Sequence, residues 1–282
     1  MRYRDAYQTA MAALPVPAET LDVPTSFGTV RAYRWAGTDP DRSPVALLPG
    51  RGSGTPMWGD VLPGLQDSGR DIIAFDALGD VGMSSQTAPL ASAGDQAAWV
   101  DQTLESMGVA KAHTVGHSFG GTVAAAHAVH HPARLKSLTL LEPVFVLGWP
   151  PAAVFFWATL ALLPVPARWR DVALARIGGV SAEDMRAGSA VGDMIAIGAR
   201  EFQASLPTPR PLTDVQLAHL EVPTYIAVAG AKSLVGGRRA LERAERLPHG
   251  TVEVWPGTTH SLPTQIPQQV SPRLQAFWTA AA

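Results

Sequence analysis

Cysteine is absent from this chain of 282 residues. The absence excludes disulfide scaffolds, cysteine nucleophiles and metal sites built on thiolates. Charged side chains are also scarce, at 16%, and their signs nearly cancel, with 22 basic against 24 acidic residues. A protein without a basic field has little to attract a phosphate backbone, so we expect no nucleic-acid partner.

No apolar segment has the length and continuity of a signal core or a membrane span. Residues 1–5 are mostly charged, and the apolar run at 10–14 is too short for a signal peptide. Residues 143–167 carry no charge, but two pairs of prolines divide them and leave 152–163 as the continuous helix candidate. We therefore expect a cytoplasmic protein without a membrane span.

What the sequence does contain is a hydrophobic fraction of 46%, typical of a globular protein with a well-filled core. Short apolar runs alternate with segments of helical spacing along most of the chain. We predict strands at 19–24, 29–35, 45–48, 71–75, 112–115, 138–141, 224–229 and 251–255, and helices at 58–65, 93–107, 122–131, 238–247 and 268–280. This alternation predicts an α/β fold with a mostly parallel central sheet flanked by helices.

The alternation stops after Pro143 and resumes near residue 221. Between these points the sequence offers only helix-like pieces cut by prolines, at 152–163, 169–177 and 182–202. We therefore predict one core made of residues 1–143 and 221–282, with a helical cap inserted at 144–220.

The segment Gly116-His117-Ser118-Phe119-Gly120 lies between a predicted strand and a predicted helix. Its spacing matches the G-x-S-x-G nucleophile elbow, a strained turn that projects a serine hydroxyl out of the sheet. Glycines are needed there because backbones crowd and the turn is strained. Ser118 is thus the predicted nucleophile, and an incidental serine in a glycine-rich turn is the structural alternative.

A serine hydroxyl needs a base to take its proton and a third group to orient that base. Of the eight histidines, His260 is the best candidate, because it follows the last predicted strand, where a doubly wound sheet gathers its functional loops. We expect His127, His130 and His131 to be surface or packing residues. Adjacent helix positions face different directions, so His130 and His131 are not a convincing metal pair. We predict no metal and no cofactor.

With these motifs in place, the chain resembles the α/β-hydrolase superfamily, in particular its cap-bearing, carboxylesterase-like branch. The resemblance runs from about residue 25 to the C-terminus. It rests on the elbow around Ser118, the Pro49-Gly50 loop, Asp76 after its strand, and the late His260.

The resemblance implies an activity and a set of roles. Ser118 would be the nucleophile and His260 the general base. The backbone N–H groups of Arg51 and Phe119 would form the oxyanion hole. Many family members have His-Gly where this chain has Pro49-Gly50, so the loop departs from their pattern at that point.

The position of the acid departs from the commonest family pattern. The family often places it just after the strand predicted here at 224–229, but Ser233 stands at that place and no carboxylate occurs between Glu221 and Glu242. Glu142, at the end of the strand after the elbow helix, keeps the order serine, acid, histidine and is our predicted acid. The alternative is that Glu142 is a structural carboxylate bonded to nearby backbone.

The predicted cap is rich in aromatic residues and poor in charge, which favours a hydrophobic or aromatic substrate. We expect substrate contacts from Trp149, Phe155, Phe156 and Trp157, and the structural alternative for some of them is packing within the cap. The predicted function is a serine hydrolase that cleaves a small-molecule ester through an acyl-enzyme. The alternatives are a thioesterase or lactonase, a non-hydrolytic tailoring enzyme such as a cyclase, and a non-catalytic ligand-binding protein. Either a monomer or a homodimer fits the sequence.

Overall fold

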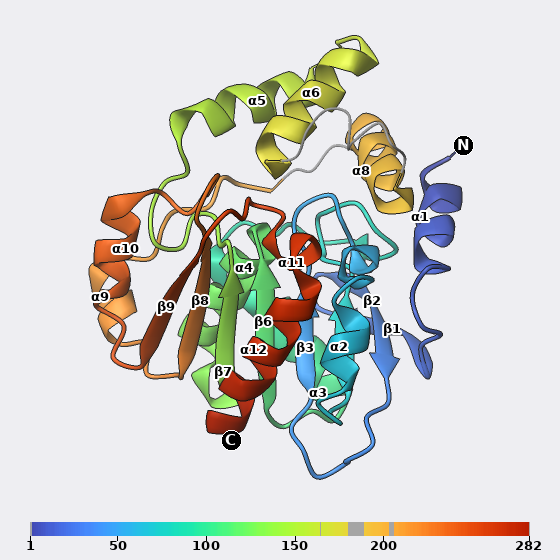
Figure 1. Ribbon diagram of the computed structural model, residues 1–282. Helices are drawn as coiled ribbons and strands as arrows, with labels where there is room; N and C mark the ends of the chain where they lie inside the picture. Colours follow the sequence, from blue (N-terminus) through green and yellow to red (C-terminus); the bar gives the residue numbers. More distant parts are fainter. Residues whose placement is uncertain (1, 164, 180–188, 203–205, 282) are drawn as a thin grey trace.

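The computed structural model describes residues 2–163, 165–179, 189–202 and 206–281 (Figure 1). Its strands are β1 (Glu19–Thr25), β2 (Gly28–Trp35), β3 (Val45–Leu48), β4 (Ile72–Phe75), β5 (Ser85–Gln86), β6 (Ala112–His117), β7 (Leu135–Leu141), β8 (Thr224–Ala229) and β9 (Gly250–Trp255). Its helices are α1 (Tyr3–Met11), α2 (Leu62–Gln66), α3 (Ala93–Ser106), α4 (Phe119–His130), α5 (Ala152–Leu162), α6 (Ala167–Gly178), α8 (Ala190–Glu201), α9 (Asp214–Ala218), α10 (Arg238–Ala244), α11 (Leu262–Gln265) and α12 (Pro267–Ala280), with 3₁₀ turns at Thr55–Trp58 and Pro132–Arg134.

The described strands form a nine-stranded sheet in the order β1-β2-β4-β3-β6-β7-β8-β9, with β5 paired to β2. Neighbours from β4 to β9 are parallel, whereas β2 pairs antiparallel with β1, β4 and β5. The predicted mostly parallel sheet flanked by helices is confirmed. Leu48 at the end of β3 pairs with Gly116 in β6, which brings the loop after β3 against the elbow.

The central strands are apolar throughout because both of their faces are buried. In β3, Ala46 and Leu48 belong to the core cluster shared with α3 and α4, whereas Val45 and Leu47 belong to the cluster shared with α2 and α12. Figure 1 shows these two pairs of helices on opposite faces of the sheet. Alternate side chains of the strand therefore enter different cores. Because both cores are apolar, the sequence shows a continuous hydrophobic run and not the alternation of apolar and polar residues typical of a half-exposed strand.

Several boundaries differ from the predicted ones. Strand β7 begins at Leu135 rather than 138, because its first residue already pairs with Ala112 of β6. Helix α4 begins at Phe119, directly after the elbow serine, three residues before the predicted start. Of the helix predicted at 182–202, α8 covers Ala190–Glu201, and residues 182–188 lie outside the described residues.

Helices α5, α6 and α8 lie beyond the carboxyl ends of the parallel strands, on the same side as the start of α4 (Figure 1). Helix α8 joins the body of the protein through Met194, which shares a core cluster with Tyr7 and Ala10 of α1. The backbone N–H of Tyr3 also donates to Glu201 Oε2 at 3.2 Å. No helix in the described ranges has the length and apolar character needed to cross a bilayer.

Candidate active site

The elbow is a sharp turn between β6 and α4 with Ser118 at its tip. Ser118 has φ 53° and ψ −118°, a backbone conformation that L-residues rarely adopt outside strained functional turns. Both flanking glycines are required by crowding. A Cβ on Gly116 would lie 2.3 Å from the carbonyl oxygen of Gly120, and a Cβ on Gly120 would lie 2.1 Å from that of Leu48. The glycine spacing thus has a direct steric cause.

This crowding predicts that Gly120→Ala lowers the free energy of unfolding by about 3 kcal/mol, at the upper end of typical overpacking costs because a main-chain carbonyl cannot turn aside. Gly94→Ala in α3 is the matched control, since its nearest neighbours are side-chain atoms no closer than 3.5 Å. It should be neutral or gain up to about 1 kcal/mol from helix propensity. Urea unfolding followed by tryptophan fluorescence measures both, and equal stabilities for the two variants would contradict the steric account.

The structure brings the three predicted catalytic side chains into one hydrogen-bonded series. Ser118 Oγ lies 2.8 Å from His260 Nε2, and His260 Nδ1 lies 3.1 Å from Glu142 Oε2. Glu142 is fully buried and His260 is only 5% exposed, whereas Ser118 is partly accessible. This geometry allows His260 to accept a proton from Ser118 while its other ring nitrogen donates to a carboxylate.

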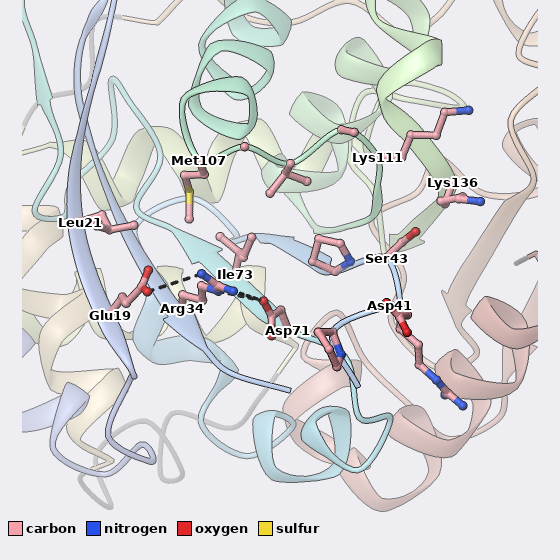
Figure 2. A pocket seen from close by; sticks show the side chains of 16 residues that line it. Glu19, Leu21, Arg34, Asp41, Ser43, Asp71, Ile73, Met107, Lys111 and Lys136 are labelled. Atoms are coloured by element: carbon pink, nitrogen blue, oxygen red, sulfur yellow. Dashed lines mark hydrogen bonds and ion pairs between the residues drawn. The ribbon is translucent and has the colours of Figure 1, made fainter. Parts of the chain in front are cut away.

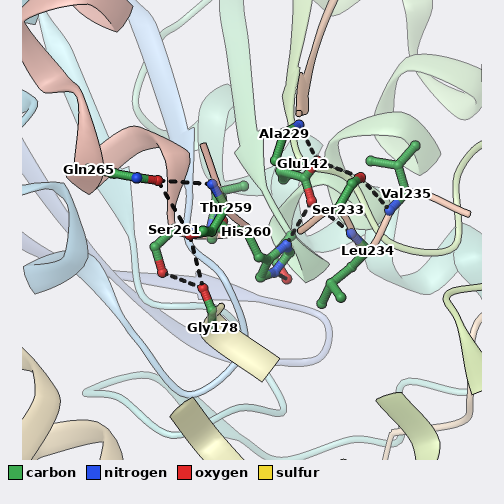
Figure 3. A network of polar contacts seen from close by, with 12 residues as sticks. Glu142, Gly178, Ala229, Ser233, Leu234, Val235, Thr259, His260, Ser261 and Gln265 are labelled. Atoms are coloured by element: carbon green, nitrogen blue, oxygen red, sulfur yellow. Dashed lines mark hydrogen bonds and ion pairs between the residues drawn. The ribbon is translucent and has the colours of Figure 1, made fainter. Parts of the chain in front are cut away.

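Glu142 is held by backbone and side-chain donors from the end of β8 and the loop that follows it (Figure 3). Its Oε1 accepts from the N–H of Ala229 at 2.6 Å and from Ser233 Oγ at 2.7 Å, and its Oε2 accepts from the N–H of Leu234 at 2.9 Å. Burial pushes the pKa of Glu142 upward, but the hydrogen bond and charge of His260, with the two backbone donors, outweigh it and lower the pKa. Glu142 therefore bonds both to backbone, as the structural alternative expects, and to His260.

His260 sits in the loop after β9, and its main chain is tied to the elbow. His117 Nε2 lies 2.8 Å from the carbonyl oxygen of His260, and the two ring centroids are 5.0 Å apart. Burial, followed by the neighbouring His260, lowers the pKa of His117 to about 3. His117 is therefore neutral and donates its Nε2–H to that carbonyl. Nothing local in the sequence signals this contact.

The last residue of helix α6 also contacts the loop that carries His260. The carbonyl oxygen of Gly178 accepts a hydrogen bond from Ser261 Oγ at 2.8 Å, and Thr259 Oγ1 lies 3.4 Å from it (Figure 3). The end of α6 is thus in direct contact with residues on both sides of His260.

The loop after β3 lies against the elbow, as an oxyanion loop would. A Cβ on Gly50 would be 2.9 Å from His117 Nδ1 and 3.4 Å from the Cβ of Ser118. In the described part of the chain, the backbone N–H groups of Arg51 and Phe119 have no hydrogen-bond partner. Neither predicted donor is therefore engaged by another described residue.

Asp76 and Asp80 hold loops together. Asp76 accepts from the N–H of Thr55 at 2.8 Å and of Met83 at 2.7 Å. Asp80 accepts from the N–H of Gly52 at 2.8 Å, which supports the loop that carries Arg51. These hydrogen bonds tie the two aspartates to the loops after β3 and β4 and not to His260.

The four aromatic residues predicted to contact substrate fall into two groups. Phe145 lies 6.3 Å from Phe119, 5.7 Å from Trp149 and 6.1 Å from Phe155 between ring centroids, so these rings form a chain that begins next to Ser118. Phe156 and Trp157 form a separate pair, 4.9 Å apart. Trp149, Phe155 and Phe156 are 54%, 40% and 62% exposed. Phe145, the ring that links the first group to Phe119, was not among the predicted contacts.

A cavity of about 560 Å³ lies elsewhere, and its lining includes none of Ser118, His260 and Glu142 (Figure 2). Its walls include Lys111 and Lys136, just before and at the start of strands, so it lies at the amino ends of the parallel strands. Three of its charged groups bond to one another, since Arg34 contacts Asp71 at 2.5 Å and Glu19 at 3.5 Å. Size alone does not identify the site, because the hydrogen-bonded series lies at the opposite ends of the strands.

Three histidines near the elbow are buried in a neutral state. Burial is the main cause that lowers the pKa of His113 and His117 to about 3 and that of His127 to about 4. His127 is fully buried, with Asp101 3.6 Å away, which agrees with the expected packing role. In the described residues no group of three or more suitable side chains could hold a metal ion.

These histidines predict a loss of stability in mild acid. Unfolded histidine takes up a proton near pH 6.5, whereas the folded protein resists until about pH 3 to 4, so the stabilisation is complete above pH 6.5 and declines below it. We expect a loss of about 1.4 kcal/mol per histidine per pH unit below pH 6. Urea unfolding at pH 7 and pH 5 measures the loss. His113→Gln should remove about a third of it, and an unchanged pH dependence in that variant would contradict the assignment.

Comparison with known proteins agrees with this geometry. The family model described as alpha/beta hydrolase fold matches residues 43–183. The chain is 25% identical to carboxylesterase YbfK of Bacillus subtilis (strain 168), over 98% of this chain and 93% of that protein. Two crystal structures from Bacillus subtilis are also similar. Naproxen esterase (carboxylesterase NP) has a TM-score of 0.87 and 22% identity, over 98% of this chain and 97% of that chain. Carboxylesterase CesB (YbfK) has a TM-score of 0.86 and 23% identity, over 98% of this chain and 96% of that chain.

The matched residues amount to half of the chain, and they contain the elbow. The chain therefore belongs to the α/β-hydrolase fold family. Within that family it is carboxylesterase-like, because carboxylesterase YbfK matches it over nearly the whole length of both chains.

Proposed function

We propose that this protein is a serine hydrolase that cleaves carboxylic esters of hydrophobic or aromatic small molecules. The observation that carries the proposal is the series Ser118–His260–Glu142, with contacts of 2.8 and 3.1 Å. The 25% identity to a carboxylesterase along 98% of the chain supports the ester as the bond that is cleaved. A ligand-binding cage needs no base aligned on a serine, so the same series favours catalysis over the non-catalytic alternative.

In the proposed reaction, Ser118 Oγ attacks the ester carbonyl carbon as His260 Nε2 accepts its proton. The backbone N–H groups of Arg51 and Phe119 bind the oxyanion of the tetrahedral intermediate. His260 then gives the proton to the leaving alcohol, and the acyl group stays on Ser118. Water, activated by the same imidazole, attacks the acyl-enzyme and releases the acid. Glu142 holds the Nδ1–H tautomer of His260 and stabilises its transient positive charge.

We further propose that residues 144–220 act as a cap on a core formed by residues 1–143 and 221–282. Helices α5, α6 and α8 of this segment lie on the side of the sheet where α4 begins, whereas α9 lies beside α10 (Figure 1). The aromatic chain from Phe119 through Phe145 to Trp149 and Phe155 leads away from the nucleophile and offers an apolar wall to the substrate. Phe156 and Trp157, also on α5, are further proposed substrate contacts.

A fluorophosphonate probe tests the nucleophile directly. The protein should be labelled on Ser118, identified by peptide mapping, and Ser118→Ala should not react. Ser43→Ala, in the cavity at the amino ends of the strands, is the matched control and should label like the wild type. Hydrolysis rates on a panel of 4-nitrophenyl and naphthyl esters, with matched thioesters and lactones, then show which type of bond the protein cleaves. Absence of labelling in the folded protein would overturn the proposed function.

A further inference from the structure

Ser233 contacts the Glu142 carboxylate through its side chain, as His260 does, whereas Ala229 and Leu234 contact it through backbone N–H groups. Its Oγ lies 2.7 Å from Glu142 Oε1, and the backbone N–H of Val235 donates to the same Oγ at 3.1 Å (Figure 3). The N–H of Val235 occupies an acceptor site of the hydroxyl. The hydroxyl hydrogen is therefore directed at the carboxylate, where it serves as a donor.

The carboxylate of Glu142 has two donors on each oxygen. Oε1 receives the N–H of Ala229 and the hydroxyl of Ser233, and Oε2 receives the N–H of Leu234 and faces His260 Nδ1. Since Glu142 is fully buried, water does not replace a donor that is lost. Removal of the Ser233 hydroxyl would leave Oε1 with one donor and free the carboxylate to turn.

The backbone places Ser233 and His260 in one unit. Ala231 and Lys232 donate their N–H groups to the carbonyl oxygen of Thr258, at 2.9 and 3.3 Å, and Lys232 pairs with Thr259 in an isolated parallel bridge. The loop that carries Ser233 is thus joined by backbone hydrogen bonds to the loop that carries His260. Glu142, from the neighbouring strand end, fits between them.

We propose that Ser233 is a positioning residue of the active site. Its hydroxyl fixes the rotation of the Glu142 carboxylate so that Oε2 faces His260 Nδ1. Ser233 touches no reacting atom and acts through Glu142. The inference rests on the proposed function, because it assigns Ser233 a part in that same triad.

A double-mutant cycle tests this role. Ser233→Ala should lower kcat about 10- to 100-fold with little change in KM, the range expected for a hydrogen bond to a charged group. In a Glu142→Ala background the same substitution should change kcat by less than about twofold, because the group it positions is gone. Ser233→Thr keeps the hydroxyl and should restore most of the activity.

The controls separate this inference from the proposed function. Ser137→Ala removes another buried hydroxyl, one bonded to His113 at 2.8 Å, and should leave kcat unchanged. Equal losses from Ser233→Ala with and without Glu142 would mean a merely structural role and overturn the inference, as would a kcat within twofold of the wild type. Failure of the wild type to react with the fluorophosphonate probe would instead overturn the proposed function. Circular dichroism of each variant confirms that it is folded.

Discussion

Replacement of Ser118 by alanine is expected to lower kcat for ester hydrolysis by a factor on the order of 10⁶. The reason is that Ser118 supplies the attacking oxygen, and alanine leaves only the oxyanion donors and substrate binding to accelerate direct attack by water. His260→Ala should cost a similar factor, since an unassisted hydroxyl is a poor nucleophile. The two side chains lie 2.8 Å apart and act as one unit, so the double variant should be no slower than either single variant.

Steady-state kinetics with an activated ester, checked by active-site titration, measure these losses. His127→Gln is a matched control for His260→Ala, because His127 is also buried but lies on α4 beside Asp101. Its kcat should stay within about twofold of the wild-type value, because the substitution lies outside the active site. Additive losses in the double variant would mean that Ser118 and His260 do not cooperate, and the proposed mechanism would be wrong.

The features that the sequence predicted well are those with a local physical cause. Gly116 and Gly120 were informative because main-chain crowding leaves no room for a Cβ at either position, so the motif records a steric constraint. The sheet was predictable because strands such as β3 bury both faces and so read as continuous apolar runs. His260 could be located because the loop after the last strand of such a sheet lies at its functional end.

The features that the sequence did not reveal depend on contacts between distant residues. Ser233 and Glu142 are 91 positions apart, and His117 and the carbonyl of His260 are 143 apart. Neither pair leaves a periodic pattern, because each contact is set by the register of the sheet and the paths of two loops. Ser233 stood out only as the residue in the place of an expected acid. The structure shows the contact that this serine makes.

Glu142→Gln is expected to lower kcat by about 10⁴, the cost of losing the orienting charge of a triad while its shape is kept. A neutral amide cannot stabilise the imidazolium, and its NH₂ group can favour the wrong tautomer of His260. The effect should fall on kcat rather than on KM, because Glu142 is fully buried behind His260. Glu253→Gln is the control. Glu253 lies on β9 and bonds to Tyr225 of β8 and Arg273 of α12, so its substitution should leave kcat unchanged.

The outcome of this substitution decides between the two roles open to Glu142. A structural carboxylate would lose stability on amidation, because the backbone donors of Ala229 and Leu234 could meet the new NH₂ group, but its folded fraction would keep nearly full activity. An acid of the triad would lose turnover even where folding is intact. Unfolding curves and kcat measured on the same samples separate the two. A kcat within a few-fold of the wild type would leave His260 without an orienting acid in the described structure and would require another source for its tautomer.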